Sequence, residues 1–328
     1  MMLKRDKKMT ESIIKLDEKY RPKTFADLVG NQQIVKDIIE MIKDKNMPHL
    51  MLNGNAGTGK TSTAHVIIKH LYNGVSKRKF IEINASEENG VDVVRTRIKE
   101  FAKMSKGSDG VGFRIIILDE VDELTSKAQA ALRRIMEIYY KHCRFILICN
   151  YKWKIIDPIQ SRCTVFDFSK ISCEEMYPRL SYICENEGID IEEKALQFVA
   201  KKSNGDMRTA LNSYLERLKT RENKVTLDYV KRFDVDCNSA LKIIKDGLNG
   251  RFVKGRQTFF GAIKRGLEIR DVLKKIDATA VEQNYPNDMK GDIALACLES
   301  EELLLKGCTN DLVIAGFVAR LSKIGRKY

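Results

Sequence analysis

Short apolar runs alternate with helical patterns through the first 168 residues of the chain. The predicted strands are Leu50–Leu52, Phe80–Ile83, Arg114–Leu118, Arg144–Cys149 and Thr164–Phe168. The predicted helices are Gln32–Lys45, Thr61–Leu71, Asp92–Met104 and Lys127–Tyr140. Apolar strands that alternate with helices are typical of a parallel sheet covered by helices on both faces. The pattern therefore predicts an α/β domain.

Strand patterns stop after about Ser169, and helical periodicity follows, as in Ile191–Ser203 and Met207–Lys219. The last third is also helical, with breaks near Gly250, Gly266 and Pro286. We expect a mobile basic tail at 1–12, the α/β domain at 13–168, a helical domain at 169–232 and a second helical domain at 233–328.

The length of 328 residues allows two or three domains. The chain has 58 Lys and Arg and 45 Asp and Glu, a formal net charge of +13. This charge suits a polyanionic partner, although a basic, solvated surface explains it equally well. The eight cysteines form no C-x-x-C pair and no ligand spacing with histidine, so they predict reduced thiols of an intracellular protein. No apolar stretch has the length of a membrane span, and Met1–Lys8 lacks the apolar run of a signal peptide.

One segment matches the phosphate-loop pattern G-x-x-x-x-G-K-[ST] at every fixed position: Gly54-Asn55-Ala56-Gly57-Thr58-Gly59-Lys60-Thr61. Its glycines let backbone N–H groups close around phosphates, Lys60 supplies a positive charge, and the Thr61 hydroxyl suits Mg²⁺. A predicted strand precedes the loop and a helix follows it, as a phosphate site requires. The alternative is an inherited loop that no longer binds ATP.

Two further predicted strands end in polar residues. Asp119 and Glu120 follow a buried strand, where they suit Mg²⁺ binding through water and activation of the attacking water. Asn150 ends another buried strand, where an amide suits orientation of that water. Solvated carboxylates and a turn asparagine are the ordinary interpretations of these residues, but the order after the P-loop favours the functional ones.

Two arginines lie at predicted domain edges. Arg162, in Ser161-Arg162-Cys163, is either a surface salt-bridge residue or a finger that reaches ATP on a neighbouring subunit. The segment by itself favours the salt bridge. Arg208 begins a helix of the second domain, where it belongs to an ordinary helical turn or reads the γ-phosphate across the cleft.

Several segments resemble the small subunits of replication factor C, the sliding-clamp loader family: Glu18-Lys-Tyr-Arg-Pro22, Asn84-Ala-Ser86, Ala128-Gln-Ala-Ala-Leu-Arg-Arg-Ile-Met-Glu137, Ile155-Ile-Asp-Pro-Ile-Gln-Ser-Arg-Cys163 and Gly205-Asp-Met-Arg208. The similarity covers essentially the whole chain, and the residues of these segments resemble archaeal members at least as closely as eukaryotic ones. It implies an AAA+ P-loop NTPase domain with a parallel sheet, a helical lid, and an all-α collar that joins subunits in a five-membered ring.

The resemblance also implies site roles. Gly54 to Thr61 would bind ATP, with Thr61 and Asp119 holding Mg²⁺ and Asp119 and Glu120 forming the Walker B pair. Asn150 would be sensor 1, Arg208 sensor 2 and Arg162 the finger acting in trans, and Arg21 and Val29 would lie near the adenine. The implied partners are the clamp-loader large subunit, other small subunits, a PCNA-type sliding clamp and primer–template DNA. The implied location is the nucleus for a eukaryotic protein and the cytoplasm for an archaeal one.

The chain departs from the family pattern at several positions. Leu16 stands near where a Trp usually precedes Glu-Lys-Tyr-Arg-Pro, so packing beside the adenine is expected to differ. Asn55 and Ala56 replace the usual Pro-Pro, which leaves backbone contacts to phosphate intact. Val121 replaces a common Ala, a change of volume only.

Basic residues that could follow a DNA backbone fall into three groups: Arg95, Arg97, Lys99 and Lys103; Lys127, Arg133 and Arg134; and Lys152 and Lys154. For each residue, a solvated helix face is an equally good interpretation, and Arg133 and Arg134 also suit packing or subunit contacts. Trp153, between two lysines, could stack on a base, but burial against the neighbouring helix is the favoured expectation.

Three other functions use the same P-loop. A protein-remodelling AAA+ machine would need an aromatic pore loop, which the sequence does not show. A small-molecule kinase fits poorly with Asp119-Glu120, the Asn150 strand and the long helical tail. A non-hydrolysing scaffold subunit is disfavoured by the presence of Lys60, Glu120 and Arg162.

Overall fold

The computed structural model describes residues 14–43, 47–72, 79–86, 91–103, 112–219, 223–231, 237–264 and 267–328. The chain divides into two compact units, Met1–Lys224 and Val225–Tyr328. The division precedes residue 233, where sequence predicts the last domain to begin. The predicted basic tail and the break at Gly266 lie outside the described residues.

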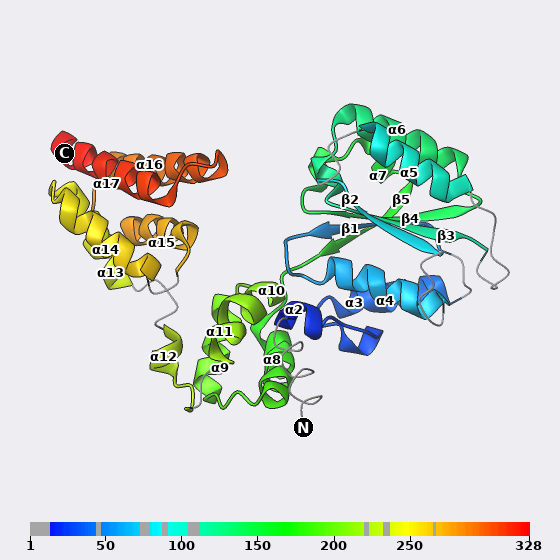
Figure 1. Ribbon diagram of the computed structural model, residues 1–328, viewed down its shortest axis with the longest axis horizontal. Coiled ribbons are helices and arrows are strands. Elements are labelled where there is room, and N and C mark those ends of the chain that lie inside the picture. Colours follow the sequence, from blue (N-terminus) through cyan, green and yellow to red (C-terminus); the bar gives the residue numbers. More distant parts are fainter. Residues whose placement is uncertain are drawn as a thin grey trace, which may run out of the picture. The chain divides into compact units, whose positions relative to one another are not determined.

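A parallel sheet forms the centre of the first unit (Figure 1). Its strands are β1 (His49–Gly54), β2 (Phe80–Asn84), β3 (Arg114–Asp119), β4 (Cys143–Cys149) and β5 (Cys163–Phe168). Every pairing is parallel, and the five strands lie in the order β2-β3-β4-β1-β5. The predicted α/β fold is confirmed. Because β4 lies between β1 and β3, the ends of three chemically distinct strands meet at one edge.

Helices cover both faces of this sheet, α3 (Gln32–Ile42) and α4 (Lys60–Tyr72) on one and α5 (Val91–Lys103) and α6 (Ser126–Ile138) on the other. Residues of β1 alternate between the faces: Leu50 and Leu52 pack in the cluster with α3 and α4, and Met51 packs with α5 and α6. Burial on both sides explains why these strands are apolar throughout. Short turns complete the domain: η1 (Phe25–Asp27), η2 (Val121–Glu123), η3 (Lys152–Lys154) and α7 (Asp157–Gln160).

A helical subdomain follows within the same unit, with α8 (Cys173–Glu187) and α9 (Glu193–Lys202) as its longer helices. Ser172 and Glu175 form a capping box at the start of α8, and Gly188 ends the helix in the left-handed conformation. The helix predicted over Met207–Lys219 is divided into α10 (Met207–Thr209), a π-helical segment η4 (Ala210–Leu215) and α11 (Glu216–Leu218). The N-terminal helix α2 (Leu16–Lys19) contacts η4.

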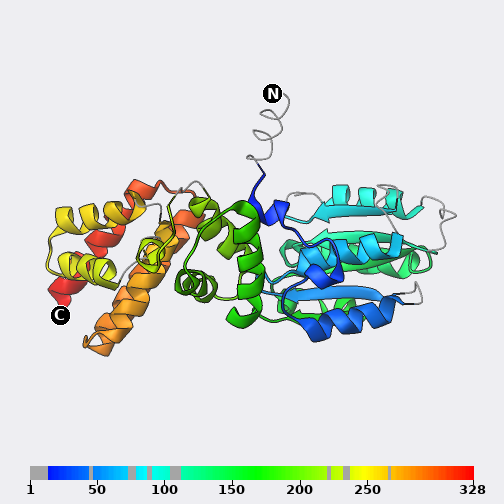
Figure 2. The ribbon, with the colours of Figure 1, turned by 90° about the horizontal axis from the view of Figure 1, so that it is seen from below.

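Helices are the only regular elements in the described residues of the second unit. It contains α12 (Leu227–Lys231), α13 (Cys237–Leu248), α14 (Phe252–Lys264), α15 (Ile269–Glu282), α16 (Asn287–Leu305) and α17 (Asn310–Lys327). Phe259 and Phe317 are fully buried at its centre, with their rings 5.9 Å apart. Figure 2 shows α13 to α17, coloured yellow to red, packed against one another. The predicted breaks at Gly250 and Pro286 fall between helices.

Candidate nucleotide-binding site

The loop after β1 has a backbone that only glycine adopts easily. Gly54, Gly57 and Gly59 have φ of 147°, 70° and 96°. A Cβ on Gly54 would lie 2.3 Å from the carbonyl oxygen of Phe168, and one on Gly57 would lie 1.6 Å from Asp206 Oδ1. The glycines of the motif therefore serve the turn itself and its close contact with the helical subdomain.

Lys60 is buried at the start of α4, with 6% of its surface exposed. Its Nζ donates to the carbonyl oxygens of Gly54 and Asn55, at 2.6 and 2.7 Å, and to Asn150 Oδ1 at 3.0 Å. Burial lowers the pKa of the Lys60 ammonium. All three acceptors are uncharged, so the hydrogen bonds hold the buried ammonium beside the phosphate loop without neutralising its charge. This arrangement fits the phosphates of a nucleotide.

Thr61 and Asp119 are adjacent, with Thr61 Oγ1 donating to Asp119 Oδ2 at 3.0 Å. Burial raises the pKa of the Asp119 carboxyl, and the hydrogen bonds from Thr61 and from the Glu120 backbone N–H only partly offset it. A hydroxyl and a buried carboxylate at the edge of a phosphate loop are oxygen ligands of the kind that Mg²⁺ prefers. These residues fit a magnesium ion that accompanies ATP.

Glu120 follows Asp119 in a left-handed conformation, with φ of 55° and ψ of 40°. Among the described residues with positive φ, it is the only one that is neither Gly nor Asn. Such backbone costs on the order of 1–3 kcal/mol and persists where the surrounding structure imposes it. The sequence gives no signal for it, because the residue type is unfavourable in this conformation.

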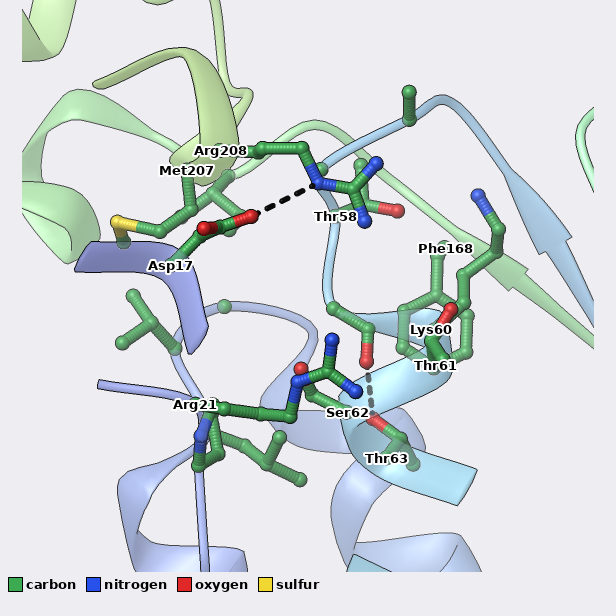
Figure 3. A pocket seen from close by; sticks show the side chains of 18 of the residues that line it. Asp17, Arg21, Thr58, Lys60, Thr61, Ser62, Thr63, Phe168, Met207 and Arg208 are labelled. Carbon is green, nitrogen blue, oxygen red and sulfur yellow. Dashed lines mark hydrogen bonds and ion pairs between the residues drawn. The ribbon is translucent and has the colours of Figure 1, made fainter. Parts of the chain in front are cut away.

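One pocket of about 380 Å³ brings most of the predicted site residues together. Its lining includes Arg21, Val29, the loop from Ala56 to Thr61, Asp119, Glu120, Asn150 and Arg208. Figure 3 shows Arg21, Lys60, Thr61 and Arg208 around it. Gly54 and Asn55, the first two residues of the loop, are not among the pocket's lining residues. Segments from the N-terminus, the sheet and the helical subdomain thus meet at a single site.

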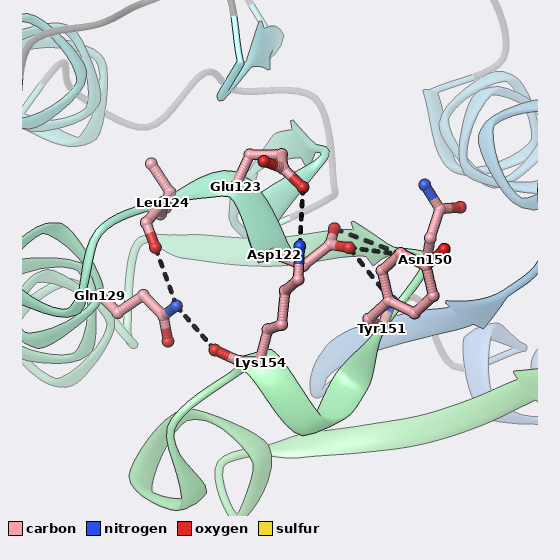
Figure 4. A network of polar contacts seen from close by, with 7 residues as sticks. All are labelled: Asp122, Glu123, Leu124, Gln129, Asn150, Tyr151 and Lys154. Carbon is pink, nitrogen blue, oxygen red and sulfur yellow. Dashed lines mark hydrogen bonds and ion pairs between the residues drawn. The ribbon is translucent and has the colours of Figure 1, made fainter. Parts of the chain in front are cut away.

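A polar network, not anticipated from sequence, fixes the end of β4 (Figure 4). The buried Asp122 accepts from the backbone N–H groups of Asn150, at 3.3 Å, and Tyr151, at 3.1 Å. Gln129, also buried, donates to the carbonyl oxygens of Leu124 and Lys154 and accepts from the N–H of Ile156. Gln129 lies in the segment Ala128–Glu137 that resembles the replication factor C family, and Asp122 follows the Asp119–Glu120 pair by two residues; neither position indicated these contacts.

Arg162 lies outside this pocket, on the surface before β5. Its guanidinium donates to Glu137 Oε1 at 2.5 Å and to the Pro158 carbonyl oxygen at 2.6 Å. The Arg162 and Glu137 side chains are each 38% exposed. Of the predicted catalytic residues, it is therefore the one that the fold separates from the phosphate loop.

The candidate DNA residues are mostly on exposed helix surfaces. Lys103 is exposed and Lys99 half-buried on α5, and the Arg95 side chain lies outside the described residues. Lys152 is paired with Asp167 at 2.7 Å, and Lys154 with Glu123 at 3.1 Å. The exposed α6 residue Arg133 pairs with Glu137 in a surface ion pair.

The prediction that Trp153 is buried is wrong: the residue is 74% exposed. Its ring lies 5.9 Å from that of Tyr151, which is 50% exposed. Ile155 and Ile159 instead fill the buried positions of this segment, so the turn of η3 leaves the indole outside. Stacking of Trp153 on a base stays a hypothesis.

Comparison with known proteins agrees with this geometry. Residues 50–170 match the family "ATPase family associated with various cellular activities (AAA)", and residues 178–216 match the "RCF1/5-like, AAA+ ATPase lid domain". A replication factor C small subunit from Sulfurisphaera tokodaii is 38% identical over 95% of this chain and 96% of its own length. One from Aeropyrum pernix is also 38% identical, over 94% and 96%. The chain belongs to the replication factor C small subunit family.

The fold of this family member is also that of a Thermotoga maritima protein, the Holliday junction branch migration motor RuvB. That structure matches with a TM-score of 0.55 and 18% identity over 80% of this chain and 91% of its own. The predicted AAA+ domain with a helical lid is confirmed. In the described part of the chain, no helix is long and apolar enough to span a membrane.

Proposed function

We propose that this member of the replication factor C small subunit family binds ATP with Mg²⁺ and hydrolyses it to drive the loading of a ring-shaped sliding clamp onto primer–template DNA. One observation carries the proposal: the phosphate loop, the Asp119–Glu120 strand end, Asn150 and the lid residue Arg208 line a single pocket. Membership of the replication factor C small subunit family supports a place in a clamp-loader complex, and the clamp and primer–template DNA are part of the proposal.

Each residue has a role that its surroundings support. The loop backbone and Lys60 hold the phosphates, Thr61 and Asp119 hold Mg²⁺, and Arg21 and Val29 face the nucleoside end of the pocket. Glu120 accepts the proton of the attacking water, and Asn150, fixed by Asp122 and bound to Lys60, orients that water. Bound Mg²⁺ would neutralise charge on the phosphates.

Arg162 completes the site of a neighbouring subunit. It lies outside the pocket of its own chain and is held at the surface by Glu137, so a second copy can meet it. Such arginine fingers contribute about 10³- to 10⁵-fold in rate in other phosphoryl-transfer enzymes. The helical residues 225–328 would join subunits with one another and with the large subunit in a five-membered ring.

The test is a mixing experiment on ATP hydrolysis, with and without primed DNA and clamp. Lys60→Ala lacks phosphate binding and Arg162→Ala lacks the finger, so we expect each alone to be nearly inactive. In a mixture, a normal pocket can meet a normal finger, and part of the activity should return. Full activity of Arg162→Ala by itself would show that the finger does not act in trans.

A further inference from the structure

An acidic residue of the N-terminal segment lies against the predicted sensor arginine. Asp17, in α2, pairs through Oδ2 with Arg208 Nε of the lid at 3.7 Å. Both residues line the candidate nucleotide pocket. Asp17 Oδ1 is buried and makes no hydrogen bond within the described part of the chain. Position 17 therefore holds a carboxylate at the pocket wall with one main partner, the arginine.

The backbone around Asp17 is anchored to the lid on both sides. Leu16 is fully buried, and its N–H donates to Glu216 Oε2 at 3.2 Å. Lys19 Nζ and the Tyr20 hydroxyl donate to Glu187 Oε1, at 2.6 and 2.5 Å. Asp17, with 19% of its side chain exposed, is thus a fixed anion, whereas the Arg208 side chain is 61% exposed.

The orientation of the guanidinium follows from this pairing. Nε faces Asp17, and Figure 3 shows the two terminal nitrogens on the opposite side, toward Thr58 of the phosphate loop. Holding an arginine by Nε leaves its two-pronged end available for an anion. It also removes part of the rotamer freedom that a long exposed side chain otherwise loses on binding.

We propose that Asp17 is a positioning residue for Arg208, aiming its terminal nitrogens at the place of the terminal phosphate. The inference rests on the proposed role of Arg208 in reading ATP. It predicts that Asp17 improves discrimination between triphosphate and diphosphate, although its own charge repels both. The position is recognisable only in the fold, because the two residues are 191 positions apart in the sequence.

The experiment measures binding of AMP-PNP and ADP by calorimetry in the presence of Mg²⁺. We expect Asp17→Asn to lower the ratio of the ADP to the AMP-PNP dissociation constant by about three- to fivefold. In an Arg208→Ala background, the same substitution should leave the ratio unchanged. Asp37→Asn, an identical change on an exposed part of α3, is the matched control, and thermal unfolding verifies that each variant is folded.

The alternative outcomes are distinct. If Asp17 acts only by repelling phosphate, Asp17→Asn would raise the ratio, and would do so equally without Arg208; this result, or an unchanged ratio, overturns the inference alone. If Arg208→Ala itself leaves the ratio unchanged, Arg208 does not read the terminal phosphate, and the proposed role of Arg208 fails together with the inference.

Discussion

Single residues carry the chemistry of this protein, and Glu120 has the most unusual backbone among them. Its left-handed conformation is unfavourable for a glutamate. Glu120 comes directly after β3, in which Ile115 to Leu118 are fully buried and paired within the sheet. Strain retained at such a point is a recurrent property of active sites. The structure therefore gives Glu120 an importance that its position after Asp119 only suggested.

Glu120→Gln should abolish most hydrolysis without weakening the fold. The amide has the same shape but cannot accept the proton, so we expect a loss of about 10²- to 10⁴-fold in ATP turnover with ATP binding retained. Single-turnover hydrolysis and equilibrium nucleotide binding would measure the two effects separately. Glu123→Gln, three residues away and paired with the surface Lys154, is the control that should keep normal turnover.

Gly57→Ala tests the contact between the phosphate loop and the lid. A methyl group there would meet Asp206 Oδ1 at 1.6 Å in a left-handed backbone, so the Asp206 side chain, which caps α10 of the lid, cannot keep its position. The backbone conformation alone costs about 1–2 kcal/mol, and we expect ATP affinity to fall at least tenfold. Gly291→Ala in α16, where a methyl group meets nothing within 4 Å, should instead leave binding unchanged.

At the scale of elements, Glu187 joins three of them. It ends α8, its side chain is 3% exposed, and it accepts hydrogen bonds from Lys19, Tyr20 and Lys219. Burial by itself would raise the pKa of the Glu187 carboxyl, but these hydrogen bonds outweigh it and lower the pKa from 4.5 to about 2. The carboxylate thus fastens the N-terminal segment to the lid.

Glu187→Gln should destabilise the first unit by about 3 kcal/mol at neutral pH. Because the folded-state pKa is below the unfolded one, this stability is complete above about pH 5 and is lost as the pH falls toward 2. We therefore expect the difference in urea unfolding between wild type and variant to shrink from pH 7 to pH 3. A pH-independent difference, or an equal effect of Glu185→Gln on the exposed side of α8, would argue against this account.

Trp153 in η3 is exposed and Phe145 in β4 is buried, so we expect their substitution by Ala to affect stability very differently. Trp153→Ala should change the free energy of unfolding by less than about 0.5 kcal/mol, since little apolar surface leaves the interior. Phe145→Ala, which empties a fully buried position, should cost about 3–5 kcal/mol. Chemical denaturation followed by circular dichroism would compare them, and a large loss for Trp153→Ala would indicate packing absent from this structure.

At the scale of the whole molecule, the net charge of +13 favours binding to a polyanion, and α5 presents part of that charge. Contacts with DNA phosphates release counterions, so the salt dependence of binding reports how many exist. Lys99→Glu combined with Lys103→Glu should weaken binding of primed DNA and lower the slope of log affinity against log salt by about one to two.

Fluorescence anisotropy at several salt concentrations would measure that slope in the assembled complex. Lys254→Glu with Arg270→Glu, exposed positions of the second unit, makes the same change in net charge and is the control. If both double variants lose affinity equally, binding depends on total charge and α5 does not contact the DNA.

Features that depend on neighbouring residues could be predicted from the amino-acid pattern alone. The apolar runs predicted each strand to within a few residues, because a strand buried on both faces must be apolar along its length. The phosphate loop could be recognised because its fixed positions all lie within one short turn of the backbone. The order of Asp119 and Asn150 after it was informative because parallel strands end at a common edge.

The contacts between segments that are distant in the sequence became visible only in the folded chain. Asp17 meets Arg208, Glu187 binds Lys19 and Tyr20, and Arg162 is held by Glu137 away from its own pocket. The exposure of Trp153 and the strained backbone of Glu120 were equally invisible in the sequence. These features depend on how segments that are distant in the sequence pack and pair their charges. Neither hydrophobic periodicity nor a short motif contains that information.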